Sequence, residues 1–201
     1  MNKIAIVDYG MGNLRSVQNA LNEFGAKGDI VASPDRLADY RKIILPGVGA
    51  FGEAAARLES SGLASELSAC AARRNLLLGI CLGMQLLFRR SEEGPTDCLG
   101  ILPEGVRRLR AEPGRPVPHM GWNQLCALHE DPLLEGIAPR DYVYFVHSYA
   151  VPVSSNTLAT AHYGEPLSAI VRRRNFWGTQ FHPERSAATG ARLLANFLRL
   201  G

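Results

Sequence analysis

The amino-acid sequence predicts an α/β fold, a three-layer open mixed sheet that is mostly parallel and carries an antiparallel extension. Three observations indicate it. Apolar runs alternate with helical patterns in the first half, strand patterns dominate the second half, and the length suits one compact domain over residues 1–201. With 46% hydrophobic and 20% charged residues, the composition is typical of globular proteins.

The first predicted strand and helix follow each other directly. Ile4–Val7 is a continuous apolar run, which is typical of a strand buried on both faces. After a glycine turn, Asn13 is a suitable N-cap for a helix, and Gly25 is well placed to end it. The apolar side chains of this helix recur at helical spacing, at Leu14, Val17, Leu21 and Phe24.

Two more strands and a broken helix complete the first half. Short apolar runs at residues 43–45 and 76–78 predict buried strands. Between them, residues 53–72 have a helical pattern that breaks near Gly62. This alternation of strands and helices predicts a largely parallel sheet that is covered by helices on both faces.

The second half differs because strand patterns follow one another with few helices between them. Such a pattern predicts an antiparallel or mixed extension of the sheet. A last amphipathic helix is expected over residues 187–200, with Leu193, Leu194 and Phe197 on its apolar side. Five strands are expected before it, at residues 106–109, 142–146, 158–162, 169–173 and 177–181.

Charge and hydropathy exclude several classes of protein. The formal net charge is +3, from 22 basic and 19 acidic residues, which is too small to indicate a nucleic-acid-binding surface. The longest apolar stretch, residues 76–88, is shorter than the roughly 20 residues that span a bilayer. The chain starts at Met1 without the layout of a signal peptide, so we expect a cytoplasmic protein.

Four cysteines are present, and no two of them form a C-x-x-C pair. A structural zinc site is therefore not expected, because the lone C-x-x-H of Cys126 and His129 lacks the second pair that such a site needs. In a reducing cytoplasm, all four are expected to be free thiols. We predict no metal and no cofactor.

The most informative segment joins an apolar strand to a helix through Gly79, Cys81 and Gly83. Glycines on both sides of a central residue permit the sharp, strained turn of a nucleophile elbow, here with cysteine in place of serine. This turn predicts Cys81 at a helix N-terminus, where partial positive charge favours the thiolate, and the N–H of Leu82 at a developing oxyanion. The alternative is a small buried cysteine between packing glycines. The strand before it and the helix after it favour the nucleophile.

A candidate base follows near the end of the last predicted strand, at His182, Pro183 and Glu184. In an extended chain, two residues that are two positions apart point to one face, and the proline disfavours helical geometry at His182. A carboxylate beside an imidazole fixes its tautomer and stabilises the imidazolium. The alternative is a strand-end histidine with an exposed glutamate. The presence of a nucleophile-elbow cysteine favours the catalytic interpretation.

These two motifs, in this order, resemble those of the class I (triad) glutamine amidotransferases. Within that family, further segments look like the glutaminase subunits of imidazole glycerol phosphate synthase, at residues 8–14, 46–52, 118–123 and 144–149. The resemblance covers nearly the whole chain. It implies a cytoplasmic enzyme of histidine biosynthesis that forms a heterodimer with a separate cyclase barrel and supplies it with ammonia from glutamine. It also implies that residues 118–123 lie at the partner interface. Without the resemblance, the sequence of this segment indicates an ordinary surface loop.

The resemblance implies roles for individual residues. The N–H groups of Leu82 and Val48 would hold the oxyanion, and Val48 follows the strand at residues 43–45, at the same sheet edge as Cys81. Glycines on both sides of Val48 allow its peptide to rotate. We hypothesise that this N–H turns inward only in the primed complex; a tight turn without a moving part is the alternative.

Gln85 lies one helical turn after Cys81, so it is expected on the same side and able to hold the substrate. The resemblance implies further substrate contacts for Gly49, His147, Ser148 and Tyr149, largely through backbone at residues 147–149. Packing alone is the alternative for Gln85 and for residues 147–149.

Three other functions remain open. The same chemistry would serve another synthase, such as the one that makes pyridoxal phosphate, although the segments around Gly10, Trp122 and His147 disfavour it. A non-catalytic regulatory subunit is a second possibility, which the intact Cys81 and His182 motifs disfavour. A thiol hydrolase or peptidase acting alone is the third, and the dependence of activity on a cyclase partner distinguishes it.

Overall fold

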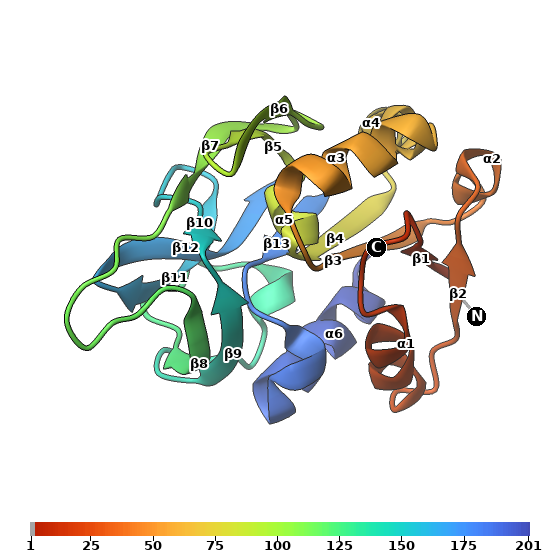
Figure 1. Ribbon diagram of the computed structural model, residues 1–201. Coiled ribbons are helices and arrows are strands. Elements are labelled where there is room, and N and C mark those ends of the chain that lie inside the picture. The colour runs from red at the N-terminus through yellow and green to blue at the C-terminus, as the bar shows by residue number, and fades with distance from the viewer. Residues whose placement is uncertain (1–2) are drawn as a thin grey trace.

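The computed structural model describes residues 3–201 and shows a seven-stranded sheet between two layers of helices (Figure 1). Met1 and Asn2, the start at which we expect no signal peptide, lie outside the described residues. The strand order is β11-β12-β13-β4-β3-β1-β2. The strands are β1 (Ile4–Val7), β2 (Gly28–Val31), β3 (Lys42–Gly47), β4 (Leu76–Cys81), β11 (Thr157–Tyr163), β12 (Glu165–Arg173) and β13 (Phe176–Thr179).

The sheet is parallel on one side and antiparallel at the other. Strands β2, β1, β3, β4 and β13 pair in parallel, whereas β12 pairs antiparallel with both β13 and β11. The predicted mixed sheet with an antiparallel extension is therefore confirmed. The helices are α1 (Leu14–Asn22), α2 (Pro34–Leu37), α3 (Phe51–Ser60), α4 (Leu63–Ala72), α5 (Leu82–Gln85), α6 (Ala187–Arg199), and the 3₁₀ turns η1 (Pro132–Leu134) and η2 (Pro183–Arg185).

Alternating side chains of the central strands divide the core into two layers. Ile4 and Ile6 of β1 pack on the face that α1 and α6 cover, together with Phe197. Ala5 and Val7 pack on the opposite face, which α3 and α4 cover (Figure 1). Because both faces of the strands are buried, the strands are continuously apolar, as the sequence predicts.

Some strands of the second half form separate sheets, which corrects the expectation of one extended sheet. Residues 106–109 belong mainly to β7, and residues 142–146 to β9. The second sheet has the order β10-β7-β5-β6, from β5 (Phe88–Ser91), β6 (Gly94–Asp97), β7 (Leu102–Arg108) and β10 (Tyr149–Ala150). A two-stranded ribbon consists of β8 (His119–Gln124) and β9 (Tyr142–His147).

Residues 118–123, whose own sequence predicts a surface loop, thus contribute most of strand β8. Its pairing partner β9 lies distant in sequence, and no local pattern reveals such a pair. Local boundaries also differ from the prediction. Helix α1 has no side-chain hydrogen bond from Asn13, Phe24 is 39% exposed beyond the helix end, and β13 stops at Thr179.

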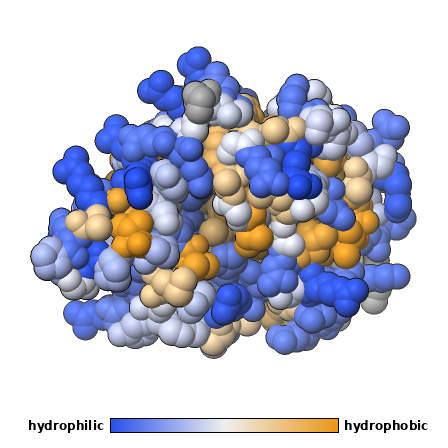
Figure 2. Space-filling view, viewed as in Figure 1, coloured by the Kyte–Doolittle hydropathy of each residue, from blue (hydrophilic) through white to orange (hydrophobic). Residues whose placement is uncertain are grey.

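The surface is mainly hydrophilic on the face shown in Figure 2, with hydrophobic residues in several separate groups. In the described residues, the structure contains no helix with the length and apolar character needed to cross a membrane. The side chains that the sequence predicts to be catalytic include Cys81, at the carboxyl end of β4, and His182, which follows β13.

Candidate active site

The carboxyl ends of β3, β4 and β13 meet at one edge of the sheet. Strands β3 and β4 are in register, so that Gly47 pairs with Cys81. On the other side of β4, Thr179 of β13 pairs with Ile80, and the chain then continues to His182. Ligands in open α/β sheets bind outside this edge. The strand order alone therefore brings the predicted nucleophile, base and oxyanion turn together.

Cys81 has the strained backbone that the elbow motif predicts. Its φ is 54° and its ψ is −109°, a region that residues other than glycine rarely adopt. The helix that follows, α5, is a single turn, and the chain then enters β5. A single turn has a smaller dipole than the full helix that the sequence predicts. The N–H groups of its first residues nevertheless stay outside the helical ladder.

Close packing explains the glycines around Cys81. A Cβ on Gly83 would lie 1.8 Å from the carbonyl oxygen of Leu45 in β3, and one on Gly79 would lie 2.6 Å from the carbonyl oxygen of Gly83. Real Cβ atoms do not approach backbone this closely. The elbow therefore contacts the neighbouring strand without any space for a side chain.

We expect the substitution Gly83→Ala to destabilise the protein by more than about 3 kcal/mol, because backbone must move to admit the methyl group. Gly52→Ala is the matched control, since Gly52 lies in α3 with its closest neighbour atom 3.6 Å from a built Cβ. In a helix that change adds about 0.5–1 kcal/mol of stability. Thermal unfolding of both variants measures the difference, and equal melting temperatures would show that the elbow tolerates a side chain.

His182 and Glu184 form a buried pair. Nδ1 of His182 is 2.8 Å from Oε1 of Glu184, and the two side chains are 6% and 2% exposed. The remaining ring nitrogen, Nε2, is buried and has no hydrogen-bond partner within residues 3–201. Because Nδ1 is engaged by the carboxylate, Nε2 is the nitrogen that is left to exchange protons with a thiol.

The surroundings of His182 favour the imidazolium. Burial of the ring opposes protonation, but the sulfur of Cys81 and the carboxylate of Glu184 outweigh it and raise the pKa of His182 from 6.5 to about 10. The ring thus carries its proton at neutral pH. A protonated imidazole beside a cysteine favours the thiolate form, which is the nucleophilic form.

A pocket of about 350 Å³ opens over Cys81. It is lined by nine of the ten residues that the sequence singles out, and Glu184, the tenth, lies behind His182. Glu93, Pro118 and Val146 also line it, although the sequence analysis names none of them as a site residue. The nine are Val48, Gly49, Cys81, Leu82, Gln85, His147, Ser148, Tyr149 and His182.

The turn after β3 lies directly beside the elbow. Val48 is 42% exposed, and Gly49 has a φ of +103° that favours glycine. A Cβ on Gly47 would lie 2.6 Å from both the backbone nitrogen of Gly83 and the hydroxyl of Tyr9. A Gly47→Ala variant would therefore disturb packing before it tested any peptide rotation. Tyr9 also donates a hydrogen bond to the carbonyl of Pro46, at 3.0 Å.

Gln180 is the main residue that the sequence prediction omits. It is fully buried, and its Nε2 lies 3.9 Å from Sγ of Cys81. Its Oε1 accepts a hydrogen bond from Nε2 of Gln85 at 3.0 Å, and the same Gln85 nitrogen donates to the carbonyl of Tyr149 at 2.9 Å. A polar residue inside an apolar strand end, two positions before His182, is the signal that identifies it in the sequence.

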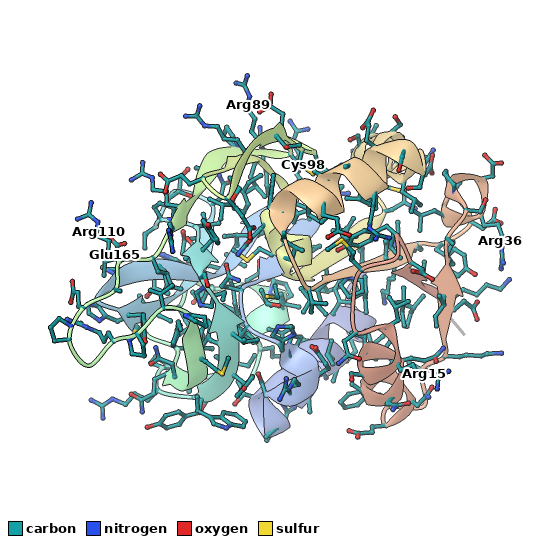
Figure 3. All side chains as sticks on the ribbon, in the orientation of Figure 1. Arg15, Arg36, Arg89, Cys98, Arg110 and Glu165 are labelled. Atoms are coloured by element: carbon teal, nitrogen blue, oxygen red, sulfur yellow. The ribbon has the colours of Figure 1, made fainter. Side chains whose placement is uncertain are left out.

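A second hollow, of about 560 Å³, lies among β5, β7, β10 and β12. Its lining includes Arg90, Arg107, Arg108 and Arg110, but it contains neither cysteine nor histidine. Arg110 projects outward at the molecular edge, as Figure 3 shows. This hollow is larger than the pocket over Cys81, but its lining lacks the cysteine nucleophile and the histidine base, so the chemistry favours the smaller pocket.

A mostly parallel sheet that carries a cysteine at a strained elbow beside a buried His–Glu pair defines a class of cysteine-dependent amide hydrolases. The model of the family glutamine amidotransferase class-I matches residues 5–200. The chain belongs to this family.

Individual relatives show a similarity more specific than the family. The chain is 48% identical to "Imidazole glycerol phosphate synthase subunit HisH" of Xanthomonas euvesicatoria over 200 residues, which is 100% of this chain and 98% of that protein. The protein of the same name from Xylella fastidiosa strain Temecula1 is also 48% identical, with the same coverage. Among solved structures, PurLQS from Thermotoga maritima has a TM-score of 0.76 at 23% identity, covering 98% of this chain and 97% of that one. At that identity, the match shows the shared fold alone.

Proposed function

We propose that the pocket over Cys81 hydrolyses glutamine to glutamate and ammonia, and that the chain does so as the glutaminase subunit of imidazole glycerol phosphate synthase. The observation that carries the proposal is the buried pair of His182 and Glu184, whose free ring nitrogen shares one pocket with Cys81. The full-length relatives support the choice of synthase.

In the first half of the reaction, the Cys81 thiolate attacks the side-chain carboxamide carbon of glutamine. A C–S bond forms, and the C=O electron pair moves to the oxygen, which the N–H groups of Leu82 and Val48 stabilise. His182 gives its proton to the nitrogen as the C–N bond breaks, so that ammonia leaves. Each oxyanion donor typically contributes about 10²–10³ in rate.

In the second half, neutral His182 takes a proton from water, and the resulting hydroxide attacks the glutamyl thioester. The C–S bond breaks, glutamate leaves, and the thiolate and imidazolium are restored. Throughout, Glu184 holds Nδ1 and stabilises the charge on the ring of His182.

The pocket also suits the rest of the glutamine molecule. Glu93 places a carboxylate in the lining, and one of its oxygens accepts the N–H of Phe51 at 2.8 Å, which holds it in place. The other oxygen is available to the α-ammonium group of a glutamine. Nε2 of Gln85 is already engaged by Tyr149 and Gln180, so Gln85 would meet the substrate through its Oε1.

The β8–β9 ribbon supplies a surface for the cyclase subunit. Three large side chains are exposed on it, with Met120 at 62%, Trp122 at 52% and Tyr142 at 54%. Beside them, the guanidinium of Arg185 lies 4.6 Å from the ring centre of Tyr144. Aromatic residues, methionine and arginine are enriched in the centres of protein interfaces. Pro118 lines the pocket and directly precedes β8, so this surface adjoins the pocket.

Val48 provides a means of making the reaction depend on the partner. We propose that the oxyanion donor at Val48 turns into the pocket only when the cyclase complex is primed with its own substrate. The positive φ of Gly49 and the exposed position of Val48 at the pocket mouth support a peptide that can rotate. We place the heterodimer in the cytoplasm, as expected for amino-acid biosynthesis.

The experiment that tests this function measures glutamate release from glutamine by the isolated chain, by the chain with a cyclase subunit, and by that complex with an analogue of the cyclase substrate. We expect little turnover alone and at least about a hundredfold stimulation in the primed complex, the value of one oxyanion donor. Strong turnover by the isolated chain would instead indicate a hydrolase that acts alone. Stimulation by a pyridoxal phosphate synthase subunit, but not by a cyclase, would indicate the other synthase.

A further inference from the structure

Two buried histidines connect the wall of the pocket to the β8–β9 ribbon. His147 lines the pocket, and His119 lies opposite it on β8. Nδ1 of His119 is 3.0 Å from Nε2 of His147, and Nδ1 of His147 is 2.9 Å from the carbonyl oxygen of Tyr149. The two residues are 3% and 6% exposed. Neither ring has a step in the hydrolysis described above.

The hydrogen-bond partners determine the tautomer of both rings. A carbonyl oxygen only accepts, so Nδ1 of His147 carries the proton and its Nε2 accepts. His119 must then donate from Nδ1. Its own Nε2 is left to accept from the amide of Asn123, at 3.3 Å. Burial keeps both rings neutral, since it lowers the pKa of His119 to about 4 and that of His147 to about 3.

Hydrogen bonds also connect the part of the pocket lining around His147 to Cys81. The carbonyl of Tyr149 accepts both from His147 and from Gln85, and Gln85 in turn donates to Gln180, whose amide nitrogen lies 3.9 Å from the Cys81 sulfur. The sulfur also lies 3.8 Å from the carbonyl oxygen of Val146. Residues 146–149, which we call the pocket wall, therefore touch the thiol directly and through two amides.

His119 is held firmly on the ribbon side. Its ring stacks against Tyr163 at 3.9 Å and against Phe145 at 4.8 Å between ring centres. The next residue on β8, Met120, is exposed. The amide of Asn123, which contacts Nε2 of His119, also donates to the carbonyl of His162. A rigid ring with one N–H aimed at His147 is a fixed point against which the pocket wall is set.

We propose that His119 is a positioning residue that, through its Nδ1–H, holds His147 and with it the pocket wall and the sulfur of Cys81. A displacement of β8 then changes the reactivity of the thiol. Binding of glutamine by the pocket wall rests on the proposed function. The positioning of the thiol by His119 does not depend on that function.

Two substitutions separate the hydrogen bond from the packing. His119→Asn places an amide N–H where Nδ1 was, whereas His119→Leu has no donor; both remove the stacked ring. We expect iodoacetamide to alkylate Cys81 about tenfold more slowly in the leucine variant, the effect of one lost hydrogen bond, and within about twofold of wild type in the asparagine variant. Mass spectrometry of peptides from the isolated chain reads each cysteine separately, and exposed Cys126 should react equally in all variants.

Equal alkylation rates in the two variants would overturn the proposal. If the ring acted only by packing, its loss would change the rate equally in both variants. Should the leucine variant fail to fold, His119→Gln replaces it, since its longer side chain brings the amide to the Nε2 position and leaves His147 without a donor. In the cyclase complex, we expect the KM for glutamine to rise about tenfold in the donor-free variant only. Unequal alkylation in a chain that hydrolyses no glutamine would reject the proposed function and retain this inference.

Discussion

Replacement of Cys81 by alanine is expected to reduce glutamine hydrolysis by at least about 10⁴-fold, even in the primed complex. Without the sulfur, no thioester forms, and the remaining groups polarise the amide without a nucleophile. Steady-state release of glutamate, with the cyclase subunit present, measures this loss. Binding of the cyclase should persist, because Cys81 is only 6% exposed and is not among the exposed side chains of the proposed docking surface.

Cys126→Ala is the matched control. It is an exposed cysteine on the loop after β8, outside the pocket, and like Cys81 a free thiol. Its removal should leave turnover unchanged within about twofold. Turnover near that of the wild type in the Cys81 variant would remove Cys81 from its proposed role, whatever the geometry of the elbow.

The second large effect is expected for Glu184→Gln, with a loss in kcat of about 10²–10⁴-fold. The amide keeps the size of the side chain but cannot stabilise the imidazolium, and it allows the wrong tautomer of His182. The side chain of Glu184 is almost completely buried, so water cannot stabilise the imidazolium in place of the carboxylate. Turnover of the primed complex at saturating glutamine checks this, and a loss below about threefold would show that Glu184 has only a packing role.

The same variant should also shift the pH profile. In the wild type the pKa of His182 is raised to about 10, so the proton-donating imidazolium is present at neutral pH and is lost only as pH rises toward 10. Glu184→Gln removes one cause of that raised pKa. The alkaline limb of the activity profile must therefore move to lower pH. An unchanged limb would mean that the carboxylate does not support the charge on the ring.

Short motifs predict chemistry when their geometry is local. The glycines around Cys81 and the spacing of His182 and Glu184 were sufficient to place a strained turn and a carboxylate–imidazole pair, because each depends on backbone within a few residues. The turn at Gly47 was placed correctly beside Cys81 for a similar reason, since successive buried strands of an α/β sheet end at one edge.

Contacts between distant segments were not predictable in this way. Gln180 meets Gln85 only because β13 inserts beside β4, and His119 meets His147 only because β8 pairs with β9. The second sheet arises because α5 ends after one turn, and no pattern in the residues after Gln85 indicates that early end.

By itself, the sequence predicted the layered α/β architecture, and it singled out Cys81 as the candidate nucleophile and Glu184 as the carboxylate beside its candidate base. These follow from periodicity and from dihedral freedom, which act over short stretches of chain. Only the tertiary structure decided how far His182 is buried, which ring nitrogen stays free, and how the pocket wall is anchored to the ribbon. Burial and hydrogen-bond partners depend on residues that the chain brings together from far apart, and it is these that set the charge on the imidazole.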